Sequence, residues 1–452
     1  MQAARPADVA RRYGAYLLVG AAVSSVLVAS LPGLAIQLTL VAGAAAVAAS
    51  VALIRIGRVL NPAWVIVIAI YLIGPIGTVL IGAGIGVSTA VVLTLAPAPF
   101  VLIAGLAHPR IWRRLVLLAP LLALLMLASL SLLWSSEPAY GAEKLTTWVL
   151  TSLLPVAFIV LLVPETPRIG WYLIAIAAFL YAVGLLLFGT YTDLFPGRLT
   201  IFATNPIWEA RAIFIGAVVV LFGPFPNFVR LVAVPVMVVG GLVTVSLGPA
   251  LGLAVGVWAG AGEALRGADR TDRRVGLGWA IFGLTTGLGL VLFIADTFGS
   301  GTPILGTLGS DPNISSRASY LGTAATLFAK SPLLGIGLGG FASTGLDTYP
   351  HNLLAEIVSE LGLVGLFIFI PWLVLAVRGA AGSPITMALV CATSVYFLFS
   401  GSLASNVEFF LFSALAVARL PLGRERIGAT LARAVRVPSP AAHVHVVSPD
   451  AS

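Results

Sequence analysis

Long apolar stretches separated by short polar segments recur along almost the whole chain. A helix needs about 20 apolar residues to cross a bilayer, and this length predicts about fourteen membrane spans. Their approximate limits are 14–31, 34–54, 63–82, 87–106, 115–134, 145–163, 170–190, 208–223, 228–245, 247–264, 275–296, 353–377, 384–401 and 405–420. The pattern therefore predicts an all-α, polytopic integral membrane helical bundle of 12–14 transmembrane helices.

The polar segments between these spans divide the chain into five predicted parts. These are a cytoplasmic N-terminus (1–13), spans 1–11 (14–296), an outer loop (297–352), spans 12–14 (353–420) and a disordered cytoplasmic tail (421–452). Within the outer loop, residues 316–330 have the pattern of an amphipathic helix, which Ser331 and Pro332 end. We expect its apolar face to lie along the outer membrane surface; that face holds Tyr320, Leu321, Ala324, Leu327 and Phe328.

Composition supports a membrane protein. The chain is 59% hydrophobic and 9% charged, which excludes an ordinary soluble domain. Cys391 is the one cysteine, so a disulfide within the chain and a cysteine-based metal site are excluded. The basic N-terminus leads into a long span without an evident cleavage site, which favours a first membrane helix over a removed signal peptide.

Charge orients the predicted spans. With the N-terminus in the cytoplasm, 20 of the 25 Lys and Arg residues fall in cytoplasmic segments, as the positive-inside rule requires. The net charge of +8 is then a property of cytoplasmic loops and does not indicate nucleic-acid binding. The cations left on the outer side are Lys144, Arg198, Arg211, Arg317 and Lys330.

The segment at 331–365 is the most informative one. Asn352, Glu356 and Glu360 are four residues apart and form one polar stripe on a helix that is otherwise apolar. Such a stripe cannot face lipid, so it predicts a protein interior or a wet cavity. Gly335, Gly337 and Gly340 spell G-x-G-x-x-G, but the dinucleotide-binding interpretation needs a strand–helix unit that is not predicted here. Two alternatives stay open, a tight turn or a turn whose N–H groups bind a phosphate.

Arginines on the outer side are candidate ligands for a diphosphate. Arg211 lies inside a predicted span, where a charge costs at least ~2.5 kcal/mol unless it is paired or wet. A pair with Glu209, or extension of the side chain to the surface, would be a structural explanation. Arg198 and Arg317 would be ordinary loop charges when taken singly. Together the three arginines have the chemistry of a clamp, because guanidinium groups bind phosphates bidentately.

His351 and Asn352 also have structural explanations, a loop histidine and a helix N-cap. The outer segments contain no D-x-D, H-x-x-x-H or cysteine pair, so no metal site is expected there. His443 and His445 form an H-x-H pair in the tail, where we expect solvated side chains.

Several of these motifs resemble those of the O-antigen ligase and Wzy-type polymerase superfamily. The resemblance rests on PLLGIGLGGF at 332–341, His351-Asn352 and ELGLVG at 360–365. Further matches over residues 115–420 are WSSEP at 134–138, Gly197-Arg198-Leu199, Asn205-Pro206 with Arg211 downstream, and Arg317 ahead of the glycine turn. Leu247 departs from the pattern, because many members have an arginine there in Ser-Arg-Gly-Pro.

The resemblance implies a metal-independent, inverting glycosyltransferase without a cofactor. It would transfer or polymerise an undecaprenyl-diphosphate-linked glycan onto a glycan or lipid acceptor, at the outer face of the cytoplasmic membrane. His351 would be the catalytic base, and Glu360 would orient it. Arg198, Arg211 and Arg317 would bind the diphosphate, and Asn352 and Gly337 would support the site.

A lipid-linked oligosaccharide flippase, or another polytopic transporter, is the alternative. Transporters place polar residues near the bilayer midplane on broken helices, whereas the intramembrane charges here fall toward the outer ends of their predicted spans. A membrane scaffold without chemistry would not need the outer cations. Ligase and polymerase are not distinguished by the sequence.

Overall fold

The computed structural model describes residues 71, 110–162, 168–192, 195–201, 205–267, 312–399 and 401–420. Apart from Tyr71, the spans expected before residue 107 lie outside these residues, as do the span at 275–296, the first part of the outer loop and the tail from 421. The chain divides into two units, 1–419 and 420–452, and every element below belongs to the first.

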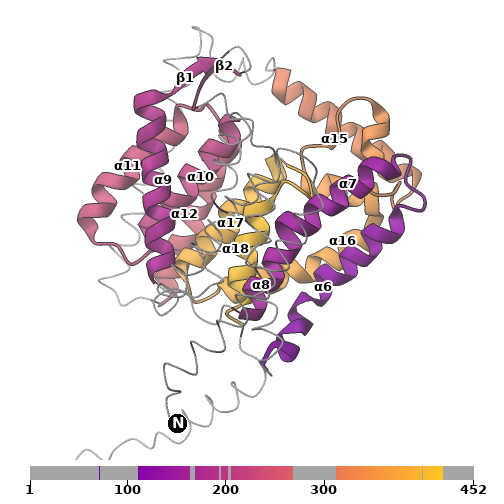
Figure 1. Ribbon diagram of the computed structural model, residues 1–452, viewed down its shortest axis with the longest axis horizontal. Helices are drawn as coiled ribbons and strands as arrows, with labels where there is room; N and C mark the ends of the chain where they lie inside the picture. Colours follow the sequence, from indigo (N-terminus) through magenta and orange to yellow (C-terminus); the bar gives the residue numbers. More distant parts are fainter. Residues whose placement is uncertain are drawn as a thin grey trace, which may run out of the picture. The chain divides into compact units, whose positions relative to one another are not determined.

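Helices dominate the described part of the chain (Figure 1). They are α6 (Arg110–Ser131), α7 (Pro138–Trp148), the π-helical turn η1 (Val149–Leu153), α8 (Leu154–Leu162), α9 (Arg168–Phe188), α10 (Pro206–Phe222), α11 (Asn227–Leu242), α12 (Leu247–Gly267), α15 (Pro312–Lys330), the 3₁₀ turn η2 (Gly340–Thr344), α16 (Leu353–Ala380), α17 (Pro384–Phe399) and α18 (Val407–Val417). Most of these helices overlap predicted spans. α15 was expected as an amphipathic helix instead, and α7 begins at Pro138, seven residues before the span predicted at 145–163.

Four helical stretches are long and apolar enough to cross a membrane, namely Arg114–Ser131, Pro138–Leu161, Gly170–Phe188 and Leu353–Ala380. Shorter apolar helices accompany them at Asn227–Leu242, Pro384–Phe399 and Val407–Val417. The described part is therefore that of a mostly helical membrane protein.

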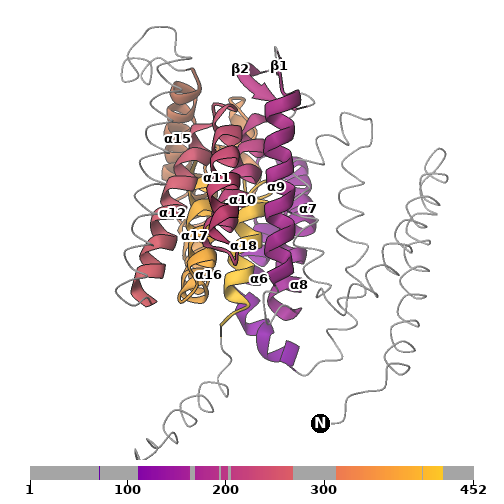
Figure 2. The ribbon, with the colours of Figure 1, turned by 90° about the vertical axis from the view of Figure 1, so that its left-hand side faces the viewer.

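One β-hairpin interrupts the helices and was not expected. β1 (Thr190–Thr192) pairs antiparallel with β2 (Phe195–Thr200), and the register shifts after Tyr191. The segment lies between the spans predicted at 170–190 and 208–223, where only a polar connection was expected. The hairpin lies at the same end of the helices as α15 in both views (Figures 1 and 2).

Small residues allow α12 and α17 to lie side by side. Gly252, Gly256 and Gly260 recur every fourth residue on α12, and a Cβ on any of them would come within 2.8 Å or less of an atom of α17. Glycines with this spacing let membrane helices approach closely. α9, α10 and α11 pack together, and α10 contacts both α12 and α17. α16 contacts α6, α15, α17 and α18.

A break at Gly362 divides α16, which was predicted as one continuous helix. Gly362 has φ 67° and ψ −165°, and a Cβ there would overlap the carbonyl oxygen of Leu333. The part after the break, residues 363–380, is about 27 Å long at 1.5 Å per residue, close to the roughly 30 Å of a bilayer core. The first part, which carries the polar stripe, is thus a separate short helix.

The apolar face of α15 packs against protein, contrary to the expectation that it lies on the membrane. Ala324 and Leu327 are buried with Phe341 of the outer loop, and Tyr320 packs against the same cluster. Leu321, on the same predicted face, remains 44% exposed. The helix also begins four residues earlier than predicted, at Pro312.

Candidate functional site

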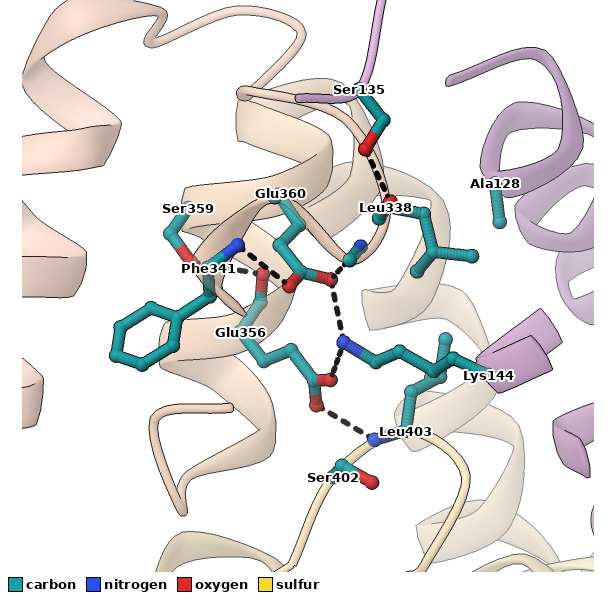
Figure 3. A network of polar contacts seen from close by, with 12 residues as sticks. Ala128, Ser135, Lys144, Leu338, Phe341, Glu356, Ser359, Glu360, Ser402 and Leu403 are labelled. Carbon is teal, nitrogen blue, oxygen red and sulfur yellow. Dashed lines mark hydrogen bonds and ion pairs between the residues drawn. The ribbon is translucent and has the colours of Figure 1, made fainter. Parts of the chain in front are cut away.

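A buried ion cluster occupies the predicted polar stripe (Figure 3). The ammonium of Lys144, on α7, lies 2.7 Å from Oε2 of Glu360 and also contacts Oε1 of Glu356. All three side chains are at most 2% exposed. Of the two surroundings expected for the stripe, a protein interior or a wet cavity, Glu356 and Glu360 lie in a protein interior, and their partner Lys144 was not expected from the sequence.

Two carboxylates and one ammonium leave one negative charge, which backbone groups help to offset. The N–H groups of Gly339 and Phe341 donate to Glu360 at 3.0 and 3.3 Å, and that of Leu403 donates to Glu356 at 2.7 Å. Glu356 also lies in the first turn of α16, where the helix dipole favours a negative charge.

The glycine turn and the break in α16 are joined through their backbones. The N–H groups of Ile336 and Gly337 donate to the carbonyls of Ser359 and Glu360, at 3.0 and 2.9 Å. In return, the N–H groups at 363 and 364 donate to the carbonyls of Pro332 and Leu333, at 2.9 and 3.1 Å. Each segment thus satisfies the groups that the other leaves open, which explains why the two motifs occur together.

Every backbone N–H from 335 to 342 is occupied by an acceptor within the protein. Besides the bonds above, the N–H of Leu338 donates to Oγ of Ser131, while those at 335, 340 and 342 donate to nearby carbonyls. The carboxylate of Glu360 lies where a phosphate-binding turn would hold its anion. Of the two alternatives for the G-x-G-x-x-G segment, the structure therefore favours the tight turn.

Gly337 supports this turn in two ways. Its φ is 90°, a conformation that other residues rarely adopt, and a Cβ would lie 2.5 Å from Cα of Ser135. Ser135 itself donates a hydrogen bond to the carbonyl of Leu338, at 2.7 Å. The WSSEP segment and the glycine turn, both parts of the family resemblance, are thus neighbours.

Asn352 is the N-cap of α16. Its Oδ1 accepts a hydrogen bond from the N–H of Ala355 at 3.0 Å, and its Nδ2 donates to the carbonyl of Leu398 on α17 at 2.8 Å. The structural explanation considered for this residue is confirmed. By holding the start of α16 against α17, Asn352 also fixes the loop that immediately precedes it.

His351 lies in that loop and has an unusual backbone. Its φ is 53°, a left-handed conformation that is uncommon outside glycine and recurs at functional sites. The ring stacks on Tyr320 of α15, with centroids 5.5 Å apart, and meets Tyr349 at 4.4 Å. The side chain keeps 26% of its surface exposed, so the ring is held in place and still accessible.

Asp347 is the polar partner of the His351 ring, at 2.9 Å between Oδ2 and Nε2. Glu360 was expected to orient His351. In the structure it instead contacts Lys144 and the glycine turn. Burial raises the pKa of Asp347, but hydrogen bonds from His351 and Thr348 outweigh burial, so this pKa is below its ordinary value. Asp347 was not among the site residues predicted from the sequence, although it lies four residues before His351 in a polar loop.

Tyr349 connects this loop electrostatically with Arg211. Burial raises the pKa of Tyr349 to about 12; the charges of Asp347 and Glu356 add to this rise, and the charge of Arg211 opposes it.

Arg211 itself is buried on α10. Its guanidinium lies 3.5 Å from Glu408 of α18, donates to the carbonyl of Tyr396 at 3.4 Å and lies over the ring of that tyrosine. With 1% of the residue exposed, extension to the surface is ruled out. Glu209, the partner considered from sequence, accepts hydrogen bonds from Ile201 and Tyr181.

Arg198 and Arg317 are partly exposed and lie on β2 and α15. The Asn205-Pro206 motif between Arg198 and Arg211 is the N-cap of α10, with Oδ1 of Asn205 accepting from Ile207. Leu247, which replaces the family arginine, begins α12 and is 47% exposed. Leu247 follows a turn in which the carbonyl of Val243 accepts a hydrogen bond from the N–H of Leu199 on β2. This departure from the family pattern therefore lies beside β2.

In the part of the chain that the structure describes, no three His, Cys, Asp or Glu side chains gather in a way that could hold a metal ion. Comparison of the chain with protein-family models, curated proteins and solved structures gave no match. The family resemblance therefore rests on the sequence motifs alone.

Proposed function

We propose that this protein is a polytopic membrane glycosyltransferase of the O-antigen ligase and polymerase type. It has about 14 spans, with both termini in the cytoplasm and the His351 loop on the outer face of the cytoplasmic membrane. It transfers or polymerises a glycan from an undecaprenyl-diphosphate donor onto a glycan or lipid acceptor. The observation that carries this proposal is the His351 ring, which Asp347 and two tyrosines hold in place.

The proposed reaction requires one proton acceptor and stabilisation of one leaving group. His351 takes the proton of the acceptor hydroxyl as its oxygen forms a bond to C1 of the donor sugar. The bond between C1 and the phosphate oxygen breaks, its electron pair leaves with the lipid diphosphate, and the configuration at C1 is inverted. Arg198, Arg211 and Arg317 stabilise the diphosphate charge, which removes the need for a metal ion.

The position of the charged groups supports an enzyme over a flippase. Glu209, Glu356 and Glu408 each lie in the first turn of a helix, and His351 lies in the loop before α16. A transporter would place such groups near the bilayer midplane. These three glutamates instead lie at helix starts, and His351 directly precedes one of them, which favours chemistry at one face of the membrane.

The test is transfer in vitro from purified lipid-diphosphate donor in the presence of EDTA. Wild type should be active, and His351→Ala should fold, insert and lose activity by about 10²-fold or more, the contribution typical of a positioned base. His443→Ala, in the predicted tail, is the matched control. Near-normal turnover by His351→Ala would remove the histidine from the mechanism, and loss of wild-type turnover in EDTA would refute the metal-free reaction.

A further inference from the structure

The carboxylate of Asp347 is held at both oxygens. Oδ1 accepts hydrogen bonds from the N–H and the hydroxyl of Thr348, at 2.6 and 3.1 Å, while Oδ2 lies 2.9 Å from Nε2 of His351. An ionised carboxylate only accepts hydrogen bonds, so Nε2 must be the ring nitrogen that carries the proton. Among the described residues, Nδ1 of His351 has no hydrogen-bond partner.

We infer that Asp347 is a positioning residue that holds the proton of His351 on Nε2 and leaves Nδ1 as the nitrogen that accepts the proton of the acceptor hydroxyl. The catalytic part of this inference rests on the proposed function, whereas the choice of nitrogen does not. Asp347 does not touch the reacting atoms; it acts through the ring. The stacking of Tyr320 on that ring restricts the ring to one orientation in the same way.

The position of Thr348 makes the inference testable by substitution. In Asp347→Asn, the N–H of Thr348 at 2.6 Å still needs an acceptor, so the amide oxygen takes the place of Oδ1. The amide NH₂ then faces Nε2 and donates to it, which moves the ring proton to Nδ1. The variant thus keeps the shape of the loop but blocks the nitrogen that must accept the proton. Asp347→Ala removes the contact without imposing the wrong ring form.

The two variants should therefore differ in an unusual order. We expect Asp347→Asn to lower kcat by about 10²-fold or more and Asp347→Ala by about tenfold, because a base held in the wrong tautomer transfers protons more slowly than a base whose tautomer is not fixed. KM for the lipid-diphosphate donor should be unchanged in both variants. A residue that only shaped the loop would give the opposite order, since alanine loses every contact. Glu143→Gln, which alters an exposed carboxylate on α7, is the control and should behave as wild type.

A second measurement reads the ring without any substrate. Nitrogen-15 NMR of histidine-labelled protein, at alkaline pH where imidazoles are neutral, distinguishes a protonated from an unprotonated ring nitrogen. The chain has four histidines, and His351→Ala identifies the signal of interest. We expect the proton on Nε2 in wild type and on Nδ1 in Asp347→Asn.

A wild-type proton on Nδ1, or greater damage from alanine than from asparagine, would overturn the inference. If wild type transfers no glycan at all, the proposed function fails, while the NMR result still decides whether Asp347 selects the ring form. The two failures are thus distinguishable.

Discussion

Replacing Lys144 with methionine should destabilise the protein strongly. Methionine has a similar length but no charge, so Glu356 and Glu360 would remain buried as two adjacent carboxylates without a cation. Breaking a buried ion pair by removing one partner costs about 3–5 kcal/mol, and here one ammonium serves two carboxylates. Because two carboxylates lose their cation at once, we expect a loss in the upper part of this range. The three backbone N–H donors remain and keep the loss from exceeding it.

The comparison with Glu356→Gln sharpens this expectation. That change leaves a one-to-one pair of Lys144 with Glu360, and the single amide oxygen can accept from Leu403 or from Lys144 but not from both, so one of these contacts is lost. We expect it to cost less than about 2 kcal/mol, the scale of one hydrogen bond to a charged group. Adding Glu356→Gln and Glu360→Gln to Lys144→Met should recover part of the lost stability, since no unpaired charge then remains buried.

Equilibrium unfolding of the detergent-solubilised protein measures these differences in the free energy of unfolding. Lys330→Met, at the exposed end of α15, is the matched control for loss of a lysine. A Lys144→Met variant within about 0.5 kcal/mol of that control, the range of ordinary surface substitutions, would refute the reasoning. So would a triple variant less stable than Lys144→Met alone.

Two further predictions concern the arginines and the topology. Arg211→Lys and Arg317→Lys should each lose most transfer activity at normal expression, because an ammonium cannot form the bidentate contacts of a guanidinium; full activity in both would argue against the diphosphate clamp. Cysteines introduced at Ser310 and Ser439 in a Cys391→Ser background should label from outside and inside the cell respectively, and reversed labelling would place His351 on the wrong face.

The sequence alone determined the class of protein and the position of most described helices. Hydrophobic length and the depletion of charge are local properties, so α6, α9 and α17 could be placed without knowing their neighbours. The burial of Glu356 and Glu360 also followed from sequence, because four-residue spacing puts both on one face of a helix and a carboxylate cannot face lipid.

Only the tertiary structure decided which groups meet across the chain. Lys144 and Glu360 are 216 residues apart, and no periodicity connects them. The break at Gly362 likewise depends on the turn that donates to its free carbonyls, so a pattern within α16 alone predicts a continuous helix. Tyr320 meets His351 because α15 packs against the loop that holds the histidine. Local spacing fixes which face of an element is polar, whereas the partner of that face is fixed by how distant helices pack.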